Sequence, residues 1–200
     1  MSTARSVRLL LFAAALLSFV GSCVESKYPL SDEKTSKIDE RLIGTWRGDV
    51  GPEGWQVEKS ARAQNALDVT MPGTDATQKM LAFTTTIKSK RYMSVKGMDE
   101  AAKNASGGAG FSVLQYAFLD KDTVQVRGME PNVIENAIAN KTLEGEVKIE
   151  RSRFLLIFTS ETRTPIITAP PRAIARYLEA HADECYPAKT EAMLTWKRKK

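Results

Sequence analysis

The chain has few of the side chains that build metal centres and disulfide frameworks. Among its 200 residues there are two cysteines, Cys23 and Cys185, and one histidine, His181. A protein zinc site uses about four ligands, mostly Cys and His, so the composition predicts no metal site and no cofactor. If Cys23 is chemically modified, Cys185 has no partner within the chain and no disulfide framework can form.

Motifs of covalent catalysis are also missing. The sequence contains no Gly-x-Ser-x-Gly elbow, and Gly107-Gly108-Ala109-Gly110 is not followed by the Lys-Ser/Thr of a phosphate-binding loop. His181 and Cys185 are four residues apart, so a Cys-His pair on one helix is conceivable. A catalytic His, however, needs a positioned nucleophile, and no motif in the sequence positions one. We therefore expect a protein that is not an enzyme.

Long apolar runs are absent except near the start of the chain. Leu9 to Val20 is apolar apart from Ser18, and two arginines, Arg5 and Arg8, precede the run. This order of charged and apolar residues is typical of an export signal. The run is also shorter than the roughly 20 residues that a membrane-spanning helix needs.

The residues that follow, Val20-Gly21-Ser22-Cys23, resemble the lipobox of bacterial lipoproteins. The resemblance implies cleavage between Ser22 and Cys23 and acylation of Cys23, which makes residues 1–22 a signal peptide and the membrane a partner. Lipoproteins kept in the inner membrane often carry Asp after the cysteine. Val24 stands there, which favours the outer membrane in a host with two membranes. The alternatives are an ordinary secretory signal with an incidental cysteine, and a plain membrane anchor.

Positive charge is less concentrated than the formal +5 of the whole chain indicates. The predicted signal holds two of the 29 basic residues and no acidic one, so 27 basic residues face 24 acidic ones in the mature chain, or +3. The final four residues, 197–200, are all basic, and the rest therefore carries −1. A nucleic-acid-binding domain gathers basic residues on one face, so we expect no nucleic-acid partner. The end of the chain is expected to be a solvated basic tail or a weak contact with anionic lipid or glycan.

Short β-prone stretches with turn residues between them fill most of the mature chain. The stretch 80–88 alternates, and Leu81, Phe83 and Ile87 share a face that is expected to be core. Helices are predicted at 131–140 and 170–182, a short helical turn at 38–42 and a loop at 103–110. The expected strands are 43–50, 55–59, 67–71, 80–88, 91–96, 111–119, 122–128, 151–160 and 191–197.

This pattern predicts a mainly β fold, an antiparallel barrel of about eight to nine strands with one or two short helices. Closure into a barrel removes exposed strand edges. The polar segment 23–37 is expected to be a flexible stalk that carries the lipidated Cys23. The barrel domain with its basic C-terminal tail is expected to occupy 38–200.

The segment Gly44-Thr45-Trp46, placed after a short helical turn and at the first expected barrel strand, resembles the lipocalin-like superfamily. The resemblance implies a calycin-type barrel in which Trp46 plugs the closed end. It also implies that a basic side chain near the end of the sequence, Lys197 or Arg198, packs over that ring. The wider order of segments is similar to that of bacterial lipocalin-like lipoproteins.

Two functions follow as expectations. The first is a lipid-anchored binding protein of the cell envelope that holds a small hydrophobic ligand inside a hollow barrel. The second is a structural or protein-interaction lipoprotein whose barrel is filled by its own side chains and whose outside meets an envelope protein. The sequence assigns no ligand-binding residue in either case.

Overall fold

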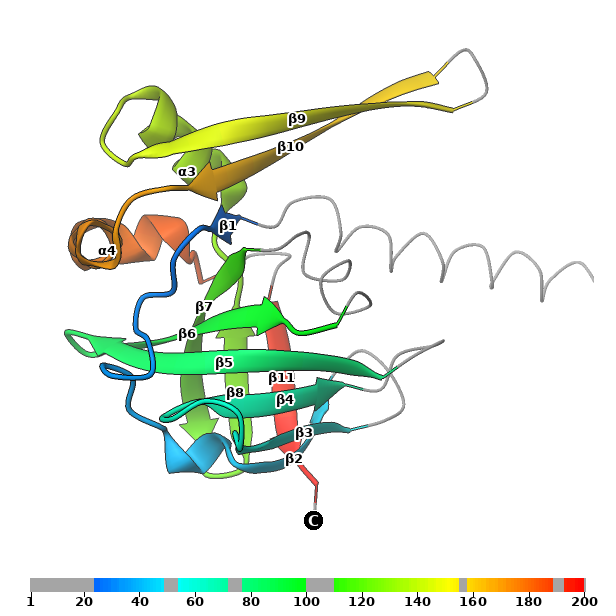
Figure 1. The fold of residues 1–200 in the computed structure, drawn as a ribbon, viewed down its shortest axis with the longest axis vertical. Coiled ribbons are helices and arrows are strands. Elements are labelled where there is room, and N and C mark those ends of the chain that lie inside the picture. The colour runs from blue at the N-terminus through cyan, green and yellow to red at the C-terminus, as the bar shows by residue number, and fades with distance from the viewer. Residues whose placement is uncertain are drawn as a thin grey trace, which may run out of the picture.

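The computed structural model describes residues 24–48, 54–71, 77–99, 110–154, 158–188 and 193–199. These residues form one eleven-stranded sheet, two α-helices and one 3₁₀ helix (Figure 1). The helical elements are η1 Glu40–Leu42, α3 Pro131–Ala139 and α4 Pro171–Cys185. The strands are β1 Glu25–Ser26, β2 Gly44–Gly48, β3 Trp55–Lys59, β4 Leu67–Met71, β5 Gln78–Ile87, β6 Lys90–Gly97, β7 Phe111–Asp120, β8 Thr123–Arg127, β9 Gly145–Phe154, β10 Phe158–Ile167 and β11 Met193–Arg198.

Eight of the strands close into an antiparallel barrel. They follow the order β6-β5-β4-β3-β2-β11-β8-β7, and the additional pairing of β6 with β7 completes the ring. β1, β10 and β9 continue the sheet outward from β7. The predicted fold class, a mainly β antiparallel barrel with short helices, is confirmed.

The alternation of side chains along the strands builds two separate cores. One core fills the barrel and includes Trp46, Met93 and Trp196. The other lies between the barrel and the helices and includes Ile87, Tyr92 and Ile174. Met93 and Tyr92 are neighbours in β6 but belong to different cores, because successive residues of a strand point to opposite faces of the sheet.

The closed end of the barrel is built around Trp46, which is fully buried. Its indole Nε1 donates a hydrogen bond to the Leu42 carbonyl oxygen at 2.7 Å, and the Arg198 guanidinium lies over the ring at 4.3 Å. Arg198 also donates to the carbonyl oxygens of Ile43 (2.8 Å) and Arg41 (2.6 Å). Of the two basic residues predicted to pack on Trp46, Arg198 does so, and it belongs to β11 instead of a solvated tail.

Gly44 is required at this end. Its backbone φ is +136°, and a Cβ atom there would lie 2.5 Å from Nη1 of Arg198. Any side chain would therefore strain the backbone and displace the guanidinium from the carbonyl groups that it binds.

The predicted flexible stalk is wrong for residues 24–37, which are part of the folded domain. Val24 and Leu30 are buried in the outer core, and β1 pairs with both β7 and β10. Ser31 and Ser36 are also buried, and their hydroxyl groups donate hydrogen bonds to the Thr84 carbonyl oxygen at 3.2 and 3.0 Å. The polar composition of the segment predicted flexibility, but these serines form hydrogen bonds with backbone groups of β5.

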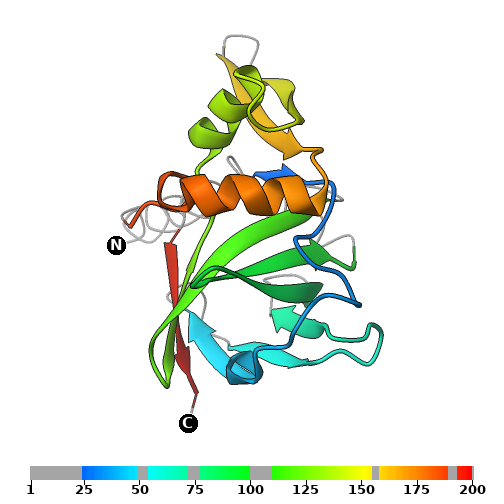
Figure 2. The same cartoon turned by 90° about the vertical axis from the view of Figure 1, so that its left-hand side faces the viewer.

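The single strand predicted at 151–160 is also wrong. β9 and β10 are two ten-residue strands that pair along their whole length, from Gly145 opposite Ile167 to Phe154 opposite Phe158. We call this hairpin, residues 145–154 and 158–167, the arm. It extends beyond the barrel, and α4 lies between the arm and the barrel (Figures 1 and 2). The charged alternation in β9 conceals the strand because neither face is uniformly apolar.

α4 packs on the outside of the barrel, where it contacts β5, and α3 packs against α4 and the two strands of the arm. α4 buries Ile174, Leu178 and Cys185 in the outer core, and α3 buries Ile134 there. Within the described ranges, no helix combines the length and apolar character needed to cross a bilayer. The predicted loop at 103–110, apart from Gly110, lies outside the described residues.

Candidate functional site

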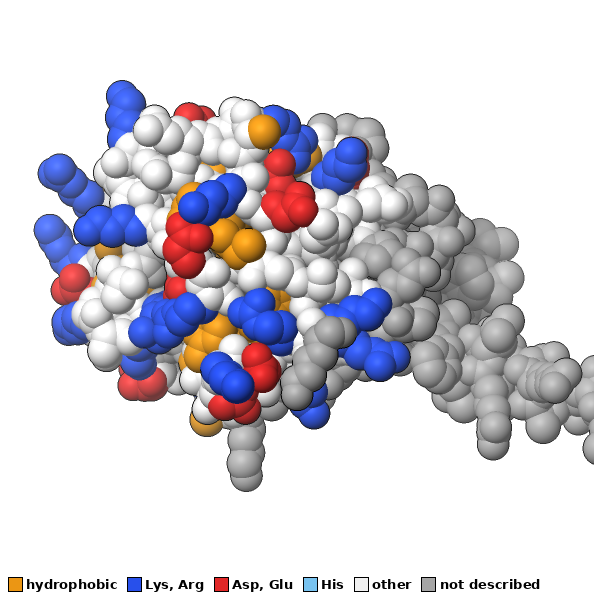
Figure 3. Space-filling view, turned by 90° about the horizontal axis from the view of Figure 1, so that it is seen from below, with side chains coloured by type: hydrophobic (Ala, Val, Ile, Leu, Met, Phe, Trp, Pro, Cys, Tyr) orange, Lys and Arg blue, Asp and Glu red, His pale blue; other side chains and the backbone are white. Residues whose placement is uncertain are grey.

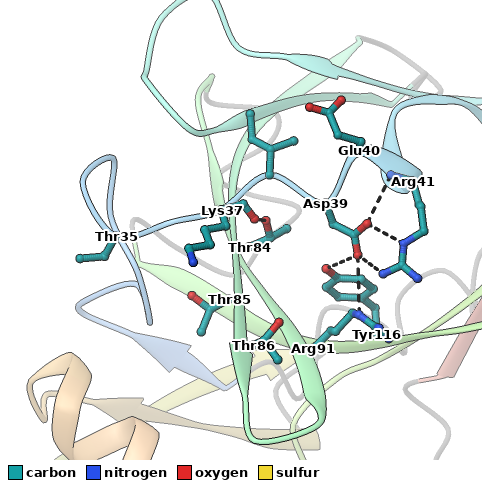
Figure 4. Close-up of a pocket in the computed structure, with 11 residues that line it drawn as sticks. Thr35, Lys37, Asp39, Glu40, Arg41, Thr84, Thr85, Thr86, Arg91 and Tyr116 are labelled. Atoms are coloured by element: carbon teal, nitrogen blue, oxygen red, sulfur yellow. Dashed lines mark hydrogen bonds and ion pairs between the residues drawn. The ribbon is translucent and has the colours of Figure 1, made fainter.

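A polar pocket of about 450 Å³ lies at the closed end of the barrel, beside η1 (Figure 4). Seen from this end, the surface carries Lys and Arg side chains around small areas of apolar surface (Figure 3). The side chains that line the pocket come from three places: the segment before η1, the end of β5 and the facing parts of β6 and β7. They are Thr35, Lys37, Ile38, Asp39, Glu40, Arg41, Thr84, Thr85, Thr86, Arg91 and Tyr116.

The length of β5 creates the pocket. β5 has ten residues and β4 has five, and the two strands pair only from Gln78 to Ala82. The edge of β5 beyond Ala82 therefore accepts another partner, the segment that leads into η1. The Lys37 amide donates to the Thr84 carbonyl oxygen at 3.4 Å, and Thr84 Oγ1 donates to the Lys37 carbonyl oxygen at 2.5 Å. These bonds hold the segment across the mouth of the pocket.

Asp39 is the centre of a hydrogen-bond network on one wall. Its Oδ1 accepts from Nε of Arg41 at 2.8 Å, and its Oδ2 accepts from Nη2 of Arg41 at 2.6 Å and from the Tyr116 hydroxyl at 3.1 Å. The Arg91 Nε lies 3.8 Å from the same Oδ2. The Arg41 guanidinium also packs over the Phe118 ring at 4.4 Å. The network joins three separate stretches of sequence at one carboxylate.

The surroundings shift the pKa values of Asp39 and Tyr116, the two buried members of the network. Burial raises the pKa of Asp39, but the hydrogen bonds and charge of Arg41 and the Tyr116 hydroxyl outweigh it, and the net pKa is lowered. Burial and the neighbouring Asp39 carboxylate raise the pKa of Tyr116 well above its usual range. Near neutral pH the pair is therefore an ionised carboxylate that accepts from a neutral phenol, an arrangement that suits positioning and ligand binding.

The charge left unpaired in the pocket is positive. Arg41 is neutralised by Asp39, and Glu40 forms an ion pair with Lys59 at 2.8 Å. Within the part of the chain that the structure describes, no carboxylate lies within 4.0 Å of the Lys37 amine, and Arg91 has only its 3.8 Å contact to Asp39. Figure 4 places Lys37 beside the threonines on one side and Arg91 beside Tyr116 on the other. Two cations and several hydroxyl groups therefore face the same space.

Replacing Asp39 by asparagine is expected to reduce stability at neutral pH by about 1.5 to 3 kcal/mol, the usual range for hydrogen bonds to a charged group. Because the folded-state pKa of Asp39 is lowered, its contribution is complete above the unfolded-state pKa of about 3.9 and is lost as the pH falls through the folded-state value. Urea unfolding of both proteins at neutral and acidic pH checks this. The difference between them should shrink in acid, and a constant difference would contradict the role of the Asp39 charge.

The described side chains inside the barrel are closely packed, in contrast to this pocket. The cavity found among the interior side chains has a volume of about 10 Å³, which is about the space of one water molecule. Trp55 packs on Trp196 with ring centroids 4.3 Å apart, and Trp46 lies 6.3 Å from Phe118. The described strands therefore enclose aromatic side chains where a hollow barrel would enclose a ligand.

The residues singled out from the sequence lie apart from the pocket. Gly44 and Trp46 are at the closed end as structural groups, whereas Cys23 and Ser22 lie outside the described residues. His181 stacks on Tyr177 with centroids 4.6 Å apart, and its Nδ1 lies 3.3 Å from Oε1 of Glu184. Cys185 is fully buried, and burial raises the pKa of its thiol to about 12. Among the described residues, no three Cys, His, Asp or Glu side chains converge as metal ligands.

Sequence reasoning missed Asp39, Arg91 and Tyr116 as members of one site. Asp39 lies within the predicted helical turn at 38–42, and the other two lie in adjacent strands with no motif around them. One signal was present: an Asp before a short helical turn is a frequent N-cap, and the Asp39 side chain accepts from the Arg41 amide at 3.3 Å. The strand pairing that brings Arg91 opposite Tyr116 has no such signal.

In comparisons with protein-family models, curated proteins and solved structures, no match to this chain was found.

Proposed function

We propose that this chain is a lipid-anchored binding protein of the cell envelope, and that its binding site is the closed-end pocket. In this proposal Cys23 carries the lipid, residues 1–22 are removed, and the outer membrane is the favoured location in a host with two membranes. A lipocalin-like origin is supported by the eight-stranded barrel, by Gly44 and Trp46, and by the position of Arg198 over the Trp46 ring. No catalytic role is proposed.

The packed interior favours a filled barrel over a hollow one. A drug-sized ligand needs a cavity of roughly 300 Å³ or more, whereas the cavity between the described interior side chains Leu42, Val57 and Trp196 is about 10 Å³. A hydrophobic ligand would have to displace side chains such as Trp196 and Met93, which are close to fully buried. The proposal therefore places ligand binding outside the barrel core, and a hydrophobic ligand within it becomes the competing prediction.

The chemistry of the pocket favours a small polar ligand that carries an acidic group. Lys37 has no carboxylate partner among the described residues, and Arg91 shares the Asp39 carboxylate with Arg41. The Thr85 and Thr86 hydroxyl groups can donate or accept hydrogen bonds. Arginine pairs well with a carboxylate or a phosphate because its planar guanidinium donates two parallel hydrogen bonds. Ile38 is the one aliphatic residue of the lining, so little apolar surface is available to a lipid tail. The excess of positive charge, with Lys37, Arg41 and Arg91 around the one Asp39 carboxylate, is the observation that carries the proposal.

Titration of the mature protein with inorganic phosphate and with glucuronate tests the site. Wild-type protein should bind at least one of them, and Arg91→Met should weaken binding by about tenfold to a hundredfold, as expected for the loss of a charge-assisted hydrogen bond. Chemical shifts of the Thr85 and Arg91 amides report the place of binding. Binding should also weaken as salt is raised, since the cations are partly exposed.

Lys121→Met is the matched control, because Lys121 is an exposed lysine next to the end of β7, at the same end of the barrel but outside the pocket. It removes the same charge and should leave binding unchanged. Equal losses in both variants would mean that the effect is general electrostatics. Stoichiometric binding of a fatty acid that quenches interior tryptophan, with no effect of Arg91→Met, would favour the hydrophobic-ligand hypothesis.

A further inference from the structure

The fold continues to within one residue of the proposed lipid attachment. Val24 is 6% exposed and packs in the outer core, and β1 follows directly at Glu25. The Lys27 amide donates to the Ile167 carbonyl oxygen at 2.8 Å, which ties the far end of β1 to β10. One residue spans at most about 3.6 Å, so Cys23 has no spacer between it and the folded domain. A lipid on Cys23 would therefore hold one particular side of the domain at the membrane.

The pairing of β1 identifies that side. β1 runs parallel to β10, with Glu25 opposite Ile166 and Ser26 opposite Ile167. The chain that precedes β1 therefore leads along β10 toward Phe158, the outer end of the arm. From Ile166 to Phe158 is eight residues, or about 26 Å at about 3.3 Å per residue. The arm thus extends past the start of β1 in the direction of the lipid.

The closed-end pocket lies on the other side of the molecule. In Figures 1 and 2 the arm is at one end of the long axis and η1, beside the pocket, is at the opposite end. A membrane that contacts the arm would leave the pocket open to solvent.

The arm has surface chemistry that suits the headgroup region of a bilayer. Ile149 of β9 is a large aliphatic side chain that is 45% exposed. Next along the strand, Arg151 is paired with Glu161 at 3.1 Å, and Arg163 lies 3.3 Å from the same carboxylate. Arginine beside exposed apolar side chains is typical of surfaces that meet phosphate headgroups.

We propose that the arm lies against the headgroups of the bilayer beside the acylated Cys23, so that the membrane covers this side of the domain and the closed-end pocket faces away. The inference rests on the proposed lipidation of Cys23. The surface that the arm contacts is a phospholipid bilayer, because the acyl chains on Cys23 enter the membrane on this side of the domain and bring the arm next to the lipid. The pocket would then sample the aqueous phase, as a receptor for a small polar molecule must.

Two positions allow a direct test, since each is an exposed apolar residue of a described strand. Ile149 lies on the arm, and Leu119 lies near the end of β7 at the closed end, 60% exposed. Each is replaced by cysteine in the full, acylated protein and labelled with an environment-sensitive fluorophore. Cys185 stays unlabelled because it is buried and the pKa of its thiol is raised to about 12, and Cys23 is blocked by the acyl group.

The labelled proteins are placed in vesicles of phosphatidylethanolamine and phosphatidylglycerol that contain a lipid with a nitroxide quencher in its headgroup. The label at Ile149→Cys should be quenched several times more strongly than the label at Leu119→Cys. Equal quenching, or stronger quenching at Leu119→Cys, in protein that sediments with the vesicles would overturn the orientation and leave the anchor intact. Protein that carries no acyl group and does not sediment would overturn the anchor and this inference together.

Discussion

Replacing Trp46 by alanine is expected to lower the free energy of unfolding by about 3 to 5 kcal/mol, the range for deleting a large buried aromatic side chain. Trp46 is fully buried, so the substitution leaves a cavity that the neighbouring strands cannot close. It also leaves the Leu42 carbonyl oxygen without its 2.7 Å hydrogen bond and the Arg198 guanidinium without the ring that it covers. Urea unfolding followed by circular dichroism measures the loss.

Two further variants separate packing from polar contacts. Trp46→Phe keeps an aromatic ring but removes the donor to Leu42, and it is expected to cost about 1 to 3 kcal/mol. Trp55→Ala makes the same deletion at a position that is only half-buried, and it should cost less than Trp46→Ala. If Trp46→Ala and Trp55→Ala destabilised the protein equally, Trp46 would not be the special element of the closed end that its geometry indicates.

Strands with sharp boundaries and one buried face could be predicted from the sequence. The predicted ranges 55–59 and 67–71 coincide with β3 and β4, where an alternating pattern lies between turn residues. The contact between Trp46 and a basic residue near the end of the chain was also foreseen, because the resemblance supplied it. The choice of Arg198 over Lys197 could not be made, since it depends on which face of β11 points toward Trp46.

The sequence does not show which face of β5 points into the barrel, because both faces of the strand are buried. Phe83 and Ile87 are buried on one face, and Met80 and Ala82 are buried on the other. Of the two faces, the one with Leu81, Phe83 and Ile87 is directed away from the barrel interior, toward the outer core. A strand covered on both sides has no polar face to mark the outside, so alternation alone does not orient it.

The closed-end pocket and part of the ordered segment 24–37 have a common cause that the sequence does not display. The pocket and the last part of the segment, residues 31–37, depend on the free edge of β5 beyond Ala82, which exists because β4 is short. Ser36 and Lys37 fill that edge, and this places Asp39 within reach of Tyr116, 77 residues later. Local patterns report helix, strand and turn, but the completion of one strand's edge by a distant segment is a property of the tertiary structure.

Replacing Cys23 by serine is expected to abolish incorporation of labelled palmitate, the largest change predicted for any single substitution in this chain. Serine offers no thiol for the lipid that the lipobox resemblance implies. Cys185→Ser is the matched control: Cys185 is fully buried with a raised thiol pKa, so its removal should leave labelling unchanged. Label retained by Cys23→Ser, or lost from Cys185→Ser, would contradict the assignment.

Cell fractionation then tests whether the mature protein is bound to membranes, because the number of acyl chains sets the strength of membrane attachment. One chain gives marginal, reversible binding at about 0.8 kcal/mol per buried methylene, whereas two or more give a stable anchor. Mature wild-type protein should therefore remain with the membranes in high salt, and its intact mass should fit a chain that begins at an acylated Cys23. Such a chain retains β1 and every later strand of the described fold, since β1 starts at Glu25. Mature protein found free, with an unmodified Cys23, would leave the domain without a membrane attachment and the arm without its proposed lipid partner.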